Sequence, residues 1–491
     1  MIRRLFKTIG ISIACFVGLL VAAYGVLVLL SLEKAPLHPE VEAFLRPEPI
    51  SVAAERNGFY FWIGLNAPAG EDPIQYGERV IAELRLRSPV SEAATAARAQ
   101  NELRLVSYDR NSVCSPENRE PCLVFAKRNA AQVRDLARLN AELLRRFEAL
   151  LRSEEFATDM PLLGPSDLLP GRQDQMALFM LAWTLDATDF AEGRLSEALK
   201  RLVARVAFLR RMQANSSALI DRVIAQAMIA RDLNFLAEVA VAEPGAARAA
   251  AAQVAVIAAP ITASERSPFR WMRHEFSQKF AAIDPGNSHA WRYSVCEAVV
   301  QAGMLELTMS DKVDERCGRW DIRMLALAGA PLMDRNAFAN QRYEAIRQLR
   351  RIDAPDTFSY LARFREIVAG VESRRRAEPK WRLRNPFGEW MAARVNTDLV
   401  ADATMYHLSA LDQDRLFALT RLAVGLVRDP VREEDIADYL KRPGVLDPAT
   451  REPFGWDSAR SQVFFVPLDP WIAARGRVGG IDGRVGLTLH E

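Results

Sequence analysis

The sequence predicts a mainly α-helical protein: an N-terminal transmembrane helix followed by packed antiparallel helical hairpins, with a small C-terminal tail that contains a β-hairpin. Three observations predict this fold class. The chain opens with a long uncharged apolar run, apolar residues then recur at three- and four-residue steps, and only the C-terminal end alternates as strands do. With 491 residues, 50% of them hydrophobic, the chain is long enough for two or three domains or one extended helical array.

The apolar run is the strongest signal in the chain. Residues 9–32 are 24 residues without a charge, and at ~1.5 Å per residue such a helix crosses a hydrocarbon core of about 30 Å. Arg3, Arg4 and Lys7 precede it, so the positive-inside rule places the N-terminus in the cytoplasm and the bulk of the chain outside. Residues 1–33 are therefore predicted to be a signal anchor whose partner is the lipid bilayer.

A cleaved signal peptide is the alternative. Its apolar region is normally about 7–15 residues long and ends at a small-x-small cleavage site. Here the run is longer, and Glu33 stands where cleavage after Ala35 would require a small residue.

Arg outnumbers Lys by 56 to 8, which suggests a GC-rich bacterial genome. We therefore expect a bacterial inner membrane and a periplasmic location for the bulk of the chain.

The cysteines fit an oxidising compartment. Besides Cys15 in the apolar run the chain has four, an even number, and disulfides persist in the periplasm. Cys114 and Cys122 flank seven residues of polar, proline-containing sequence, and Cys296 and Cys317 flank twenty, enough for a helix and a return. Of the three pairings that four cysteines allow, we expect the local one, with free buried thiols as the alternative.

The rest of the chain divides into a linker at 34–56, a helical periplasmic domain at 57–384, and a C-terminal helix with the small β-containing tail at 385–491. Helices are expected at 75–87, 91–105, 129–156, 173–243, 246–259, 267–280, 287–309, 335–352, 357–376 and 405–428, and strands at 461–469 and 485–490. Turns inside the long helical stretch are expected at Asp186, Gly193, Asn215 and Ser217. No fixed-period repeat is present, so a repeat array is not predicted.

An aromatic row opens the folded part of the chain. It consists of Phe59, Tyr60, Phe61 and Trp62. On a helix these residues cover a whole turn, and a segment that is apolar on all sides is usually buried against other helices. We therefore expect the row to begin the core, with Gly64 and Pro68 ending its element. The alternative is a surface that an envelope protein partner contacts.

A basic stretch lies near the middle of the C-terminal half, interleaved with Trp381 and Trp390. Its six cations are Arg374, Arg375, Arg376, Lys380, Arg382 and Arg384. They are a candidate contact for anionic lipid headgroups or another anionic envelope polymer. The alternative is a solvated connector whose Trp side chains pack in the core.

No motif predicts a catalytic, cofactor-binding or metal-binding residue. The stretch HEFSQK starts like a zinc-protease motif at His274, but Gln278 stands where the second His is required. The sequence contains no C-x-x-C, G-x-S-x-G or P-loop, and His274 and His289 are not at zinc-ligand spacing. Because these motifs are missing, no small-molecule cofactor is expected. The formal net charge is +2, and the N-terminal cations supply +3, so the rest of the chain is about −1 and nucleic acid is not an expected partner.

Three stretches, NGFYFWIGLNAPAGEDPIQYGE, ALIDRVIAQAMIARDLNFLAEV and LRNPFGEW, together resemble uncharacterised proteobacterial single-pass inner-membrane proteins with a helical periplasmic domain. The resemblance implies that architecture and no activity. DPATREPFGWDSARSQVFFVP is similar to the Asp-Pro…Pro-Phe module that closes some pseudopilin-like proteins, although basic residues and not a prepilin cleavage site precede the span.

The leading hypothesis is a non-enzymatic interaction or scaffold protein of the envelope. An enzyme acting on an envelope polymer such as peptidoglycan is one alternative, because a single Glu in a groove suffices for such chemistry and leaves no spacing signature. An accessory subunit of a secretion or pilus-like machine is the other. A groove with a buried Glu of strongly shifted pKa would favour the enzyme, and a broad exposed apolar face would favour the scaffold.

Overall fold

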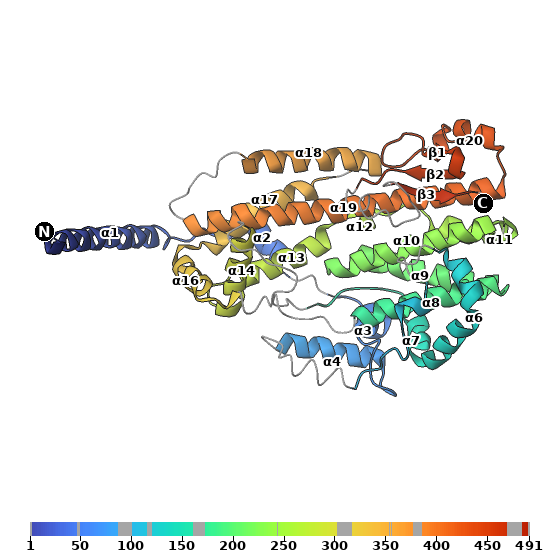
Figure 1. Ribbon diagram of the computed structural model, residues 1–491, viewed down its shortest axis with the longest axis horizontal. Helices are drawn as coiled ribbons and strands as arrows, with labels where there is room; N and C mark the ends of the chain where they lie inside the picture. The colour runs from blue at the N-terminus through green and yellow to red at the C-terminus, as the bar shows by residue number, and fades with distance from the viewer. Residues whose placement is uncertain are drawn as a thin grey trace. The chain divides into compact units, whose positions relative to one another are not determined.

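Figure 1 shows the computed structural model of the chain. It describes residues 2–46, 50–86, 101–114, 120–160, 172–242, 244–301, 317–352, 354, 356–376, 385–468 and 484–489. The chain is 72% helix and 3% strand, with a small three-stranded antiparallel sheet near the C-terminus. The predicted fold class, mainly α with a β-containing tail, is confirmed.

The chain forms two compact units. Unit 1 comprises residues 1–47, 276–352 and 365–402, and unit 2 comprises residues 48–275, 353–364 and 403–491. The helices of unit 1 are α1 (Ile2–Leu30), α2 (Pro39–Leu45), α14 (Ser288–Gln301), α16 (Trp320–Gly329), the short η3 (Ala330–Leu332) and α17 (Arg335–Arg350). Those of unit 2 are η1 (Ala54–Arg56), α3 (Gly58–Ile63), α4 (Pro73–Leu86), η2 (Arg110–Ser112), α6 (Cys122–Leu139), α7 (Ala141–Leu151), α8 (Arg172–Ala191), α9 (Leu195–Asn215), α10 (Leu219–Ala242), α11 (Pro244–Ile257), α12 (Ala263–Arg266), α20 (Glu433–Tyr439), η4 (Pro443–Val445) and η5 (Ser458–Arg460). The unit boundaries fall within α13 (Phe269–Ala282), α18 (Thr357–Arg376) and α19 (Pro386–Arg428).

Unit 1 has a small core with two parts. In one, the ring of Phe44 from α2 lies 5.7 Å from Phe276 and 5.1 Å from Tyr343 of α17, measured between centroids. In the other, α14 packs against α16, and the indole of Trp291 donates to the carbonyl of Ala326 at 2.8 Å. The short helix α2 is therefore part of the packed structure even though it follows the apolar helix α1 by only a few residues.

Unit 2 has a larger core in which α6, α8, α9 and α10 pack in pairs. The aromatic row lies in α3, which ends at Ile63 with Gly64 as its C-cap, as expected, and α3 packs closely on α4. A Cβ on Gly64 would lie 1.8 Å from the Pro73 carbonyl oxygen, and a Cβ on Gly77 would lie 2.0 Å from the Tyr60 carbonyl oxygen. Only glycine at both positions permits this approach of the two helices.

The sheet closes unit 2 at its C-terminal end. Strands β1 (Gly455–Asp457), β2 (Gln462–Phe465) and β3 (Val485–Thr488) are antiparallel in the order β1-β2-β3. Val463 pairs with Leu487 and Phe465 with Val485, and all four side chains are buried. Alternate residues therefore face the core, which is the period-two pattern that predicts β2 and β3 from the sequence.

Candidate functional site

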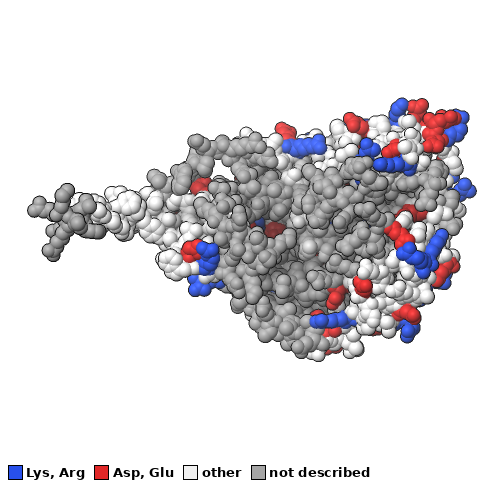
Figure 2. All heavy atoms as spheres, viewed as in Figure 1, with Lys and Arg blue, Asp and Glu red and all other residues white. Residues whose placement is uncertain are grey.

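Helix α1 is the first feature with a functional meaning. Its residues Thr8–Leu30 are long and apolar enough to cross a membrane, and none of them is buried against the protein. Their surface is the uncharged white stretch that leads out of the folded part in Figure 2. A 23-residue helix of ~1.5 Å per residue reaches across a hydrocarbon core of about 30 Å.

The chain that follows α1 is bound to unit 1 at once. Lys34 Nζ donates to the carbonyl of Met333 at 2.7 Å. The amide of Ala35 donates to the carboxylate of Asp334 at 2.7 Å, and this carboxylate also caps α17. Further hydrogen bonds join Ala35 to Asn336, and Pro36 and His38 to Asn340. Residues 34–38, placed in the linker by the sequence analysis, are thus held by the N-terminal turns of α17.

Helix α16 lies beside this junction (Figure 1). The hydroxyl of Tyr24 in α1 donates to the carbonyl of Ala328 in α16 at 3.1 Å, and η3, which continues α16, also contacts α1. The inner face of α16 carries Ile322 and Ala326, both buried. Its outer face is apolar as well, and it is exposed.

A disulfide fixes the start of α16. Cys296 in α14 and Cys317, three residues before Trp320, are bonded with an S–S distance of 2.10 Å, and both are buried. Because α14 supplies both Cys296 and the Trp291 indole that binds Ala326, one helix holds α16 near its beginning and toward its end. The exposed face of α16 is therefore presented on a braced helix.

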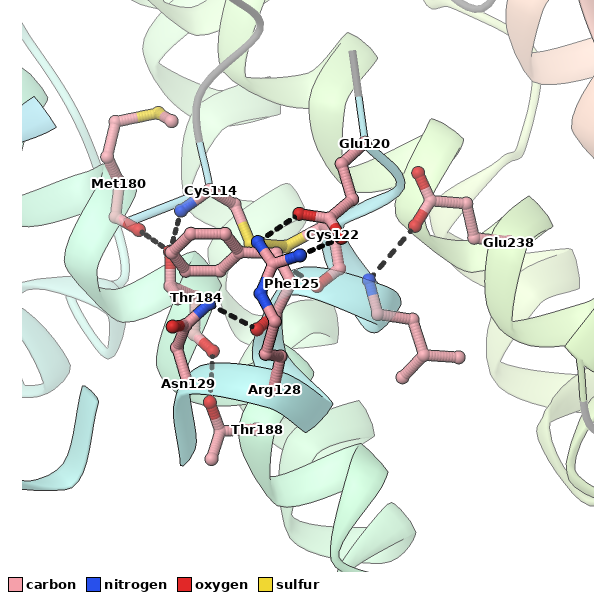
Figure 3. Close-up of a disulfide and its surroundings, with 11 residues drawn as sticks. Cys114, Glu120, Cys122, Phe125, Arg128, Asn129, Met180, Thr184, Thr188 and Glu238 are labelled. Atoms are coloured by element: carbon pink, nitrogen blue, oxygen red, sulfur yellow. Dashed lines mark hydrogen bonds and ion pairs between the residues drawn. A yellow bond between two sulfur atoms is a disulfide. The ribbon is translucent and has the colours of Figure 1, made fainter. Parts of the chain in front are cut away.

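The second disulfide lies at the start of α6 in unit 2 (Figure 3). Cys114 and Cys122 are bonded with an S–S distance of 2.07 Å. The Cys114 amide donates to the hydroxyl of Thr184 in α8 at 2.9 Å. Both local pairings expected from the sequence are present, and the expectation of disulfides is confirmed. Cys15, in α1, is free.

Glu238 reaches from α10 toward the same helix start (Figure 3). Its carboxylate accepts a hydrogen bond from the Leu123 amide at 3.4 Å. Pro121, the N-cap residue of α6, makes no side-chain capping hydrogen bond of its own. Burial raises the pKa of Glu238 to about 7, although the amides of Leu123 and Cys122 favour the charged form. Glu238 is not predicted as a site residue from the sequence, because it lies at a helical position with no motif around it.

Other buried charges of unit 2 form internal ion pairs. Arg205 in α9 bonds Asp186 in α8 at 2.5 Å and Asp232 in α10 at 2.6 Å, and all three side chains are buried. Asp186 lies within α8, so the turn expected there is wrong. Burial raises the pKa of Asp232 to about 6, against the opposing charge of Arg205.

A second cluster of one buried Arg and two Asp side chains joins α19 to the C-terminal tail. Arg415 bonds Asp412 at 2.9 Å and Asp447 at 2.6 Å, and its guanidinium also donates to the Val466 carbonyl at 2.7 Å. Asp412 in turn accepts the amide of Leu468. These charges have partners inside the fold, which is the requirement for burying them.

His407 lies in a small pocket of unit 2. The pocket is lined in part by Arg222, Arg266 and Trp271, and it has room for little more than a water molecule. Burial lowers the pKa of His407 to about 3, assisted by the charges of Arg222 and Arg266. The imidazole is therefore neutral near pH 7, and its ring packs 4.7 Å from Tyr360.

The sequence-predicted sites fall in different places. Phe59 and Trp62 are buried in the core of unit 2, and Tyr60 and Phe61 are partly buried against it. The side chains of the six cations, Arg374, Arg375, Arg376, Lys380, Arg382 and Arg384, lie outside the described residues. Burial lowers the pKa of His274 to about 4, and within the described ranges no group of three or more His, Cys, Asp or Glu could hold a metal ion.

Helix α16 was not among the helices expected from the sequence. The signal that marks it is the i, i+4, i+7 spacing of Trp320, Met324 and Leu327.

Comparison of the chain with protein-family models, with curated proteins and with solved structures finds no match. The resemblances noted from the sequence therefore stay predictions.

Proposed function

We propose that the protein is a bitopic bacterial inner-membrane protein with a cytoplasmic N-terminus, that unit 2 and the part of unit 1 after α1 lie in the periplasm, and that it acts there as an interaction or scaffold protein. The observation that carries the proposal is the bound junction after α1. Lys34 and Ala35 are hydrogen-bonded to Met333 and Asp334, so the chain that follows α1 is bound to the rest of unit 1. A protein built in this way presents a folded surface at a fixed distance from the membrane.

The proposed orientation has two supports. Arg3, Arg4 and Lys7 precede the apolar residues of α1, and cytoplasmic flanks are enriched in such cations. Both disulfides lie after α1, and disulfides form and persist in the periplasm but are rare in the cytosol.

The scaffold role is supported by how unit 2 uses its charges. Arg205 and Arg415 each bind two carboxylates inside the fold. On the described part of the face shown in Figure 2, Lys and Arg lie among Asp and Glu. The exposed pair of Arg432 and Asp435 is one example of such neighbouring opposite charges. The buried charges of Arg205 and Arg415 thus stabilise the fold of unit 2. The exposed apolar side chains of α16 in unit 1 remain available for contact with a partner.

Topology and partnership need separate measurements. A reporter that is active only in the periplasm should be active when fused after Glu491, and a cytoplasm-only reporter at the same position should be inactive. Replacing Arg3, Arg4 and Lys7 by Glu should reduce the periplasmic signal, since the charge bias is then removed.

Affinity purification from solubilised membranes should recover a partner with the full chain and not with a chain cut after Arg46. Cytoplasmic reporter activity would refute the orientation, and absence of any partner specific to the full chain would refute the scaffold role.

An enzyme acting on an envelope polymer is the second candidate, and Glu238 is the observation that favours it. A carboxyl group with a pKa of about 7 can act as a general acid near neutral pH. Its position at the start of α6 supports a structural role instead, since it accepts an otherwise uncapped amide. Glu238→Gln separates the two: peptidoglycan cleavage by the purified chain, lost in this variant while the fold is kept, would establish the enzyme.

A further inference from the structure

Apart from α1, the described part of unit 1 exposes a row of large apolar side chains on the outer face of α16. Trp320 is 75% exposed, Met324 45% and Leu327 68%, and all three follow one another at four- and three-residue steps. No described residue covers them. A row of large apolar side chains is normally buried, so this face requires an apolar partner.

The position of α16 identifies that partner. Tyr24, which binds the carbonyl of Ala328, lies six residues before the end of α1 at Leu30, or ~9 Å along the helix axis at about 1.5 Å per residue. Side chains on a helix tilt toward its N-terminus, so the Tyr24 hydroxyl lies no closer to the end of α1 than its own backbone does. The C-terminal end of α16 is therefore level with the apolar part of α1.

We propose that α16 lies in the bilayer interface beside α1, with Trp320, Met324 and Leu327 in contact with the lipid acyl chains of the periplasmic leaflet. The inference rests on the proposed function, because it requires α1 to span the membrane. The depth agrees with that of interfacial helices, whose apolar faces enter the headgroup and acyl boundary by roughly 5–10 Å. Trp is also the residue that membrane interfaces favour.

The polar residues of α16 fit the same orientation. Arg319 and Asp321 form an ion pair at 3.0 Å near the start of the helix, at the end away from Ala328, and Arg323 is exposed. An Arg side chain beside an apolar face can keep its guanidinium at the level of the phosphates while its stem packs on apolar surface. Charge thus lies toward the headgroups and the apolar row toward the acyl chains.

Two elements would then hold unit 1 on the membrane. Helix α1 fixes it laterally, and α16, braced by the Cys296–Cys317 disulfide and by Trp291, restricts its rotation about α1. The folded surface would therefore be presented in one orientation as well as at one distance.

The test places a nitroxide on the full chain in nanodiscs of phosphatidylethanolamine and phosphatidylglycerol. The background is Cys15→Ser, and the labelled variants are Met324→Cys and Leu327→Cys. Leu19→Cys, exposed in α1, serves as the lipid control, and Val256→Cys, an exposed apolar position on α11, as the water control. Power saturation compares collisions with oxygen, which concentrates in lipid, against collisions with a water-soluble nickel chelate.

Labels at 324 and 327 are expected to be several-fold more accessible to oxygen relative to nickel than the label at 256. If they behave like 256 while the label at 19 is in lipid, the inference about α16 is overturned and the proposed anchor stands. If the label at 19 is also in water, the proposed function itself fails. Spin–spin broadening that disappears on dilution with unlabelled chain would show that a second copy, and not lipid, covers α16, and would equally overturn the inference.

Discussion

Unit 2 and unit 1 bury their apolar residues to different extents. In unit 2 the core runs from Phe59 in α3 to Leu489 after β3, and the buried charges of Arg205 and Arg415 are paired with carboxylates. Among the described residues of unit 1, the core around Trp291 is smaller, it includes a disulfide, and α16 exposes apolar side chains. Both units have one disulfide, and we expect unit 1, with the smaller described core, to gain relatively more of its stability from that cross-link.

The largest expected effect separates two Trp residues. Trp62 is 1% exposed in the core of unit 2, so Trp62→Ala should lower the free energy of unfolding by roughly 3–5 kcal/mol. Trp320→Ala removes the same side chain from an exposed position in unit 1 and should change it by about 0.5 kcal/mol or less. Thermal unfolding of both variants in the same detergent measures the contrast. Equal shifts would mean that the two Trp residues do not differ in burial.

Arg205 gives the next largest effect. Arg205→Leu leaves Asp186 and Asp232 buried without their common partner, and breaking a buried ion pair costs roughly 3–5 kcal/mol. Protonation of one carboxylate offsets part of the loss, because the pKa of Asp232 is already raised to about 6. The control is Arg432→Leu, whose exposed pair with Asp435 should be worth about 0–1 kcal/mol. Urea unfolding at pH 7 compares the two, and similar midpoints would contradict the importance of the buried cluster.

Removing the disulfide of each unit compares how much the two cross-links contribute to stability. They close rings across sequence separations of 8 and 21, and the chain-entropy model assigns about 2.6 and about 3.4 kcal/mol to rings of these sizes. Replacing Cys296 and Cys317 by Ala should therefore destabilise unit 1 by about 0.8 kcal/mol more than the same change at Cys114 and Cys122 destabilises unit 2. Hydrogen exchange read separately in the two units measures this. A larger loss in unit 2 would reverse the proposed dependence of unit 1 on its cross-link.

Local signals in the sequence were sufficient for much of the fold. An uncharged run predicts α1, two closely spaced cysteine pairs predict the disulfides, and alternation predicts β2 and β3. The burial of Phe59 and Trp62 follows from a turn that is apolar on every side. Each of these inferences uses residues close together in the chain.

Long-range pairing was the part that the sequence could not supply. Asp186 resembles a turn residue when only its neighbours are considered, and its partner Arg205 comes from another helix. The linker prediction for residues 34–38 missed that α17, about 300 residues later, supplies their hydrogen-bond partners. Helix α16 was missed because its apolar residues occupy two faces, and only the structure distinguishes Ala326 on the inner face from Leu327 on the outer one.

The last comparison concerns the pH dependence of stability that Glu238 contributes. Its pKa is raised from 4.5 to about 7, so between these values the folded chain binds more protons than the unfolded chain. The contribution to stability is therefore fully present below about pH 4.5 and is lost as pH rises through 7. Glu238→Gln keeps an oxygen that can accept the Leu123 amide and removes the ionisation.

This variant should be close to the natural chain in stability at pH 5 and more stable at pH 8. The difference between the two chains isolates Glu238, because Asp232, whose raised pKa has the same sign of effect, is present in both. Glu148→Gln, at an exposed position of α7, is the matched control and should show no such crossover. Urea midpoints at pH 5 and pH 8 give the measurement. A variant that is less stable than the natural chain at pH 8 would mean that the charged carboxylate stabilises the start of α6, and the cap would then depend on the charge of Glu238 and not only on its hydrogen bond.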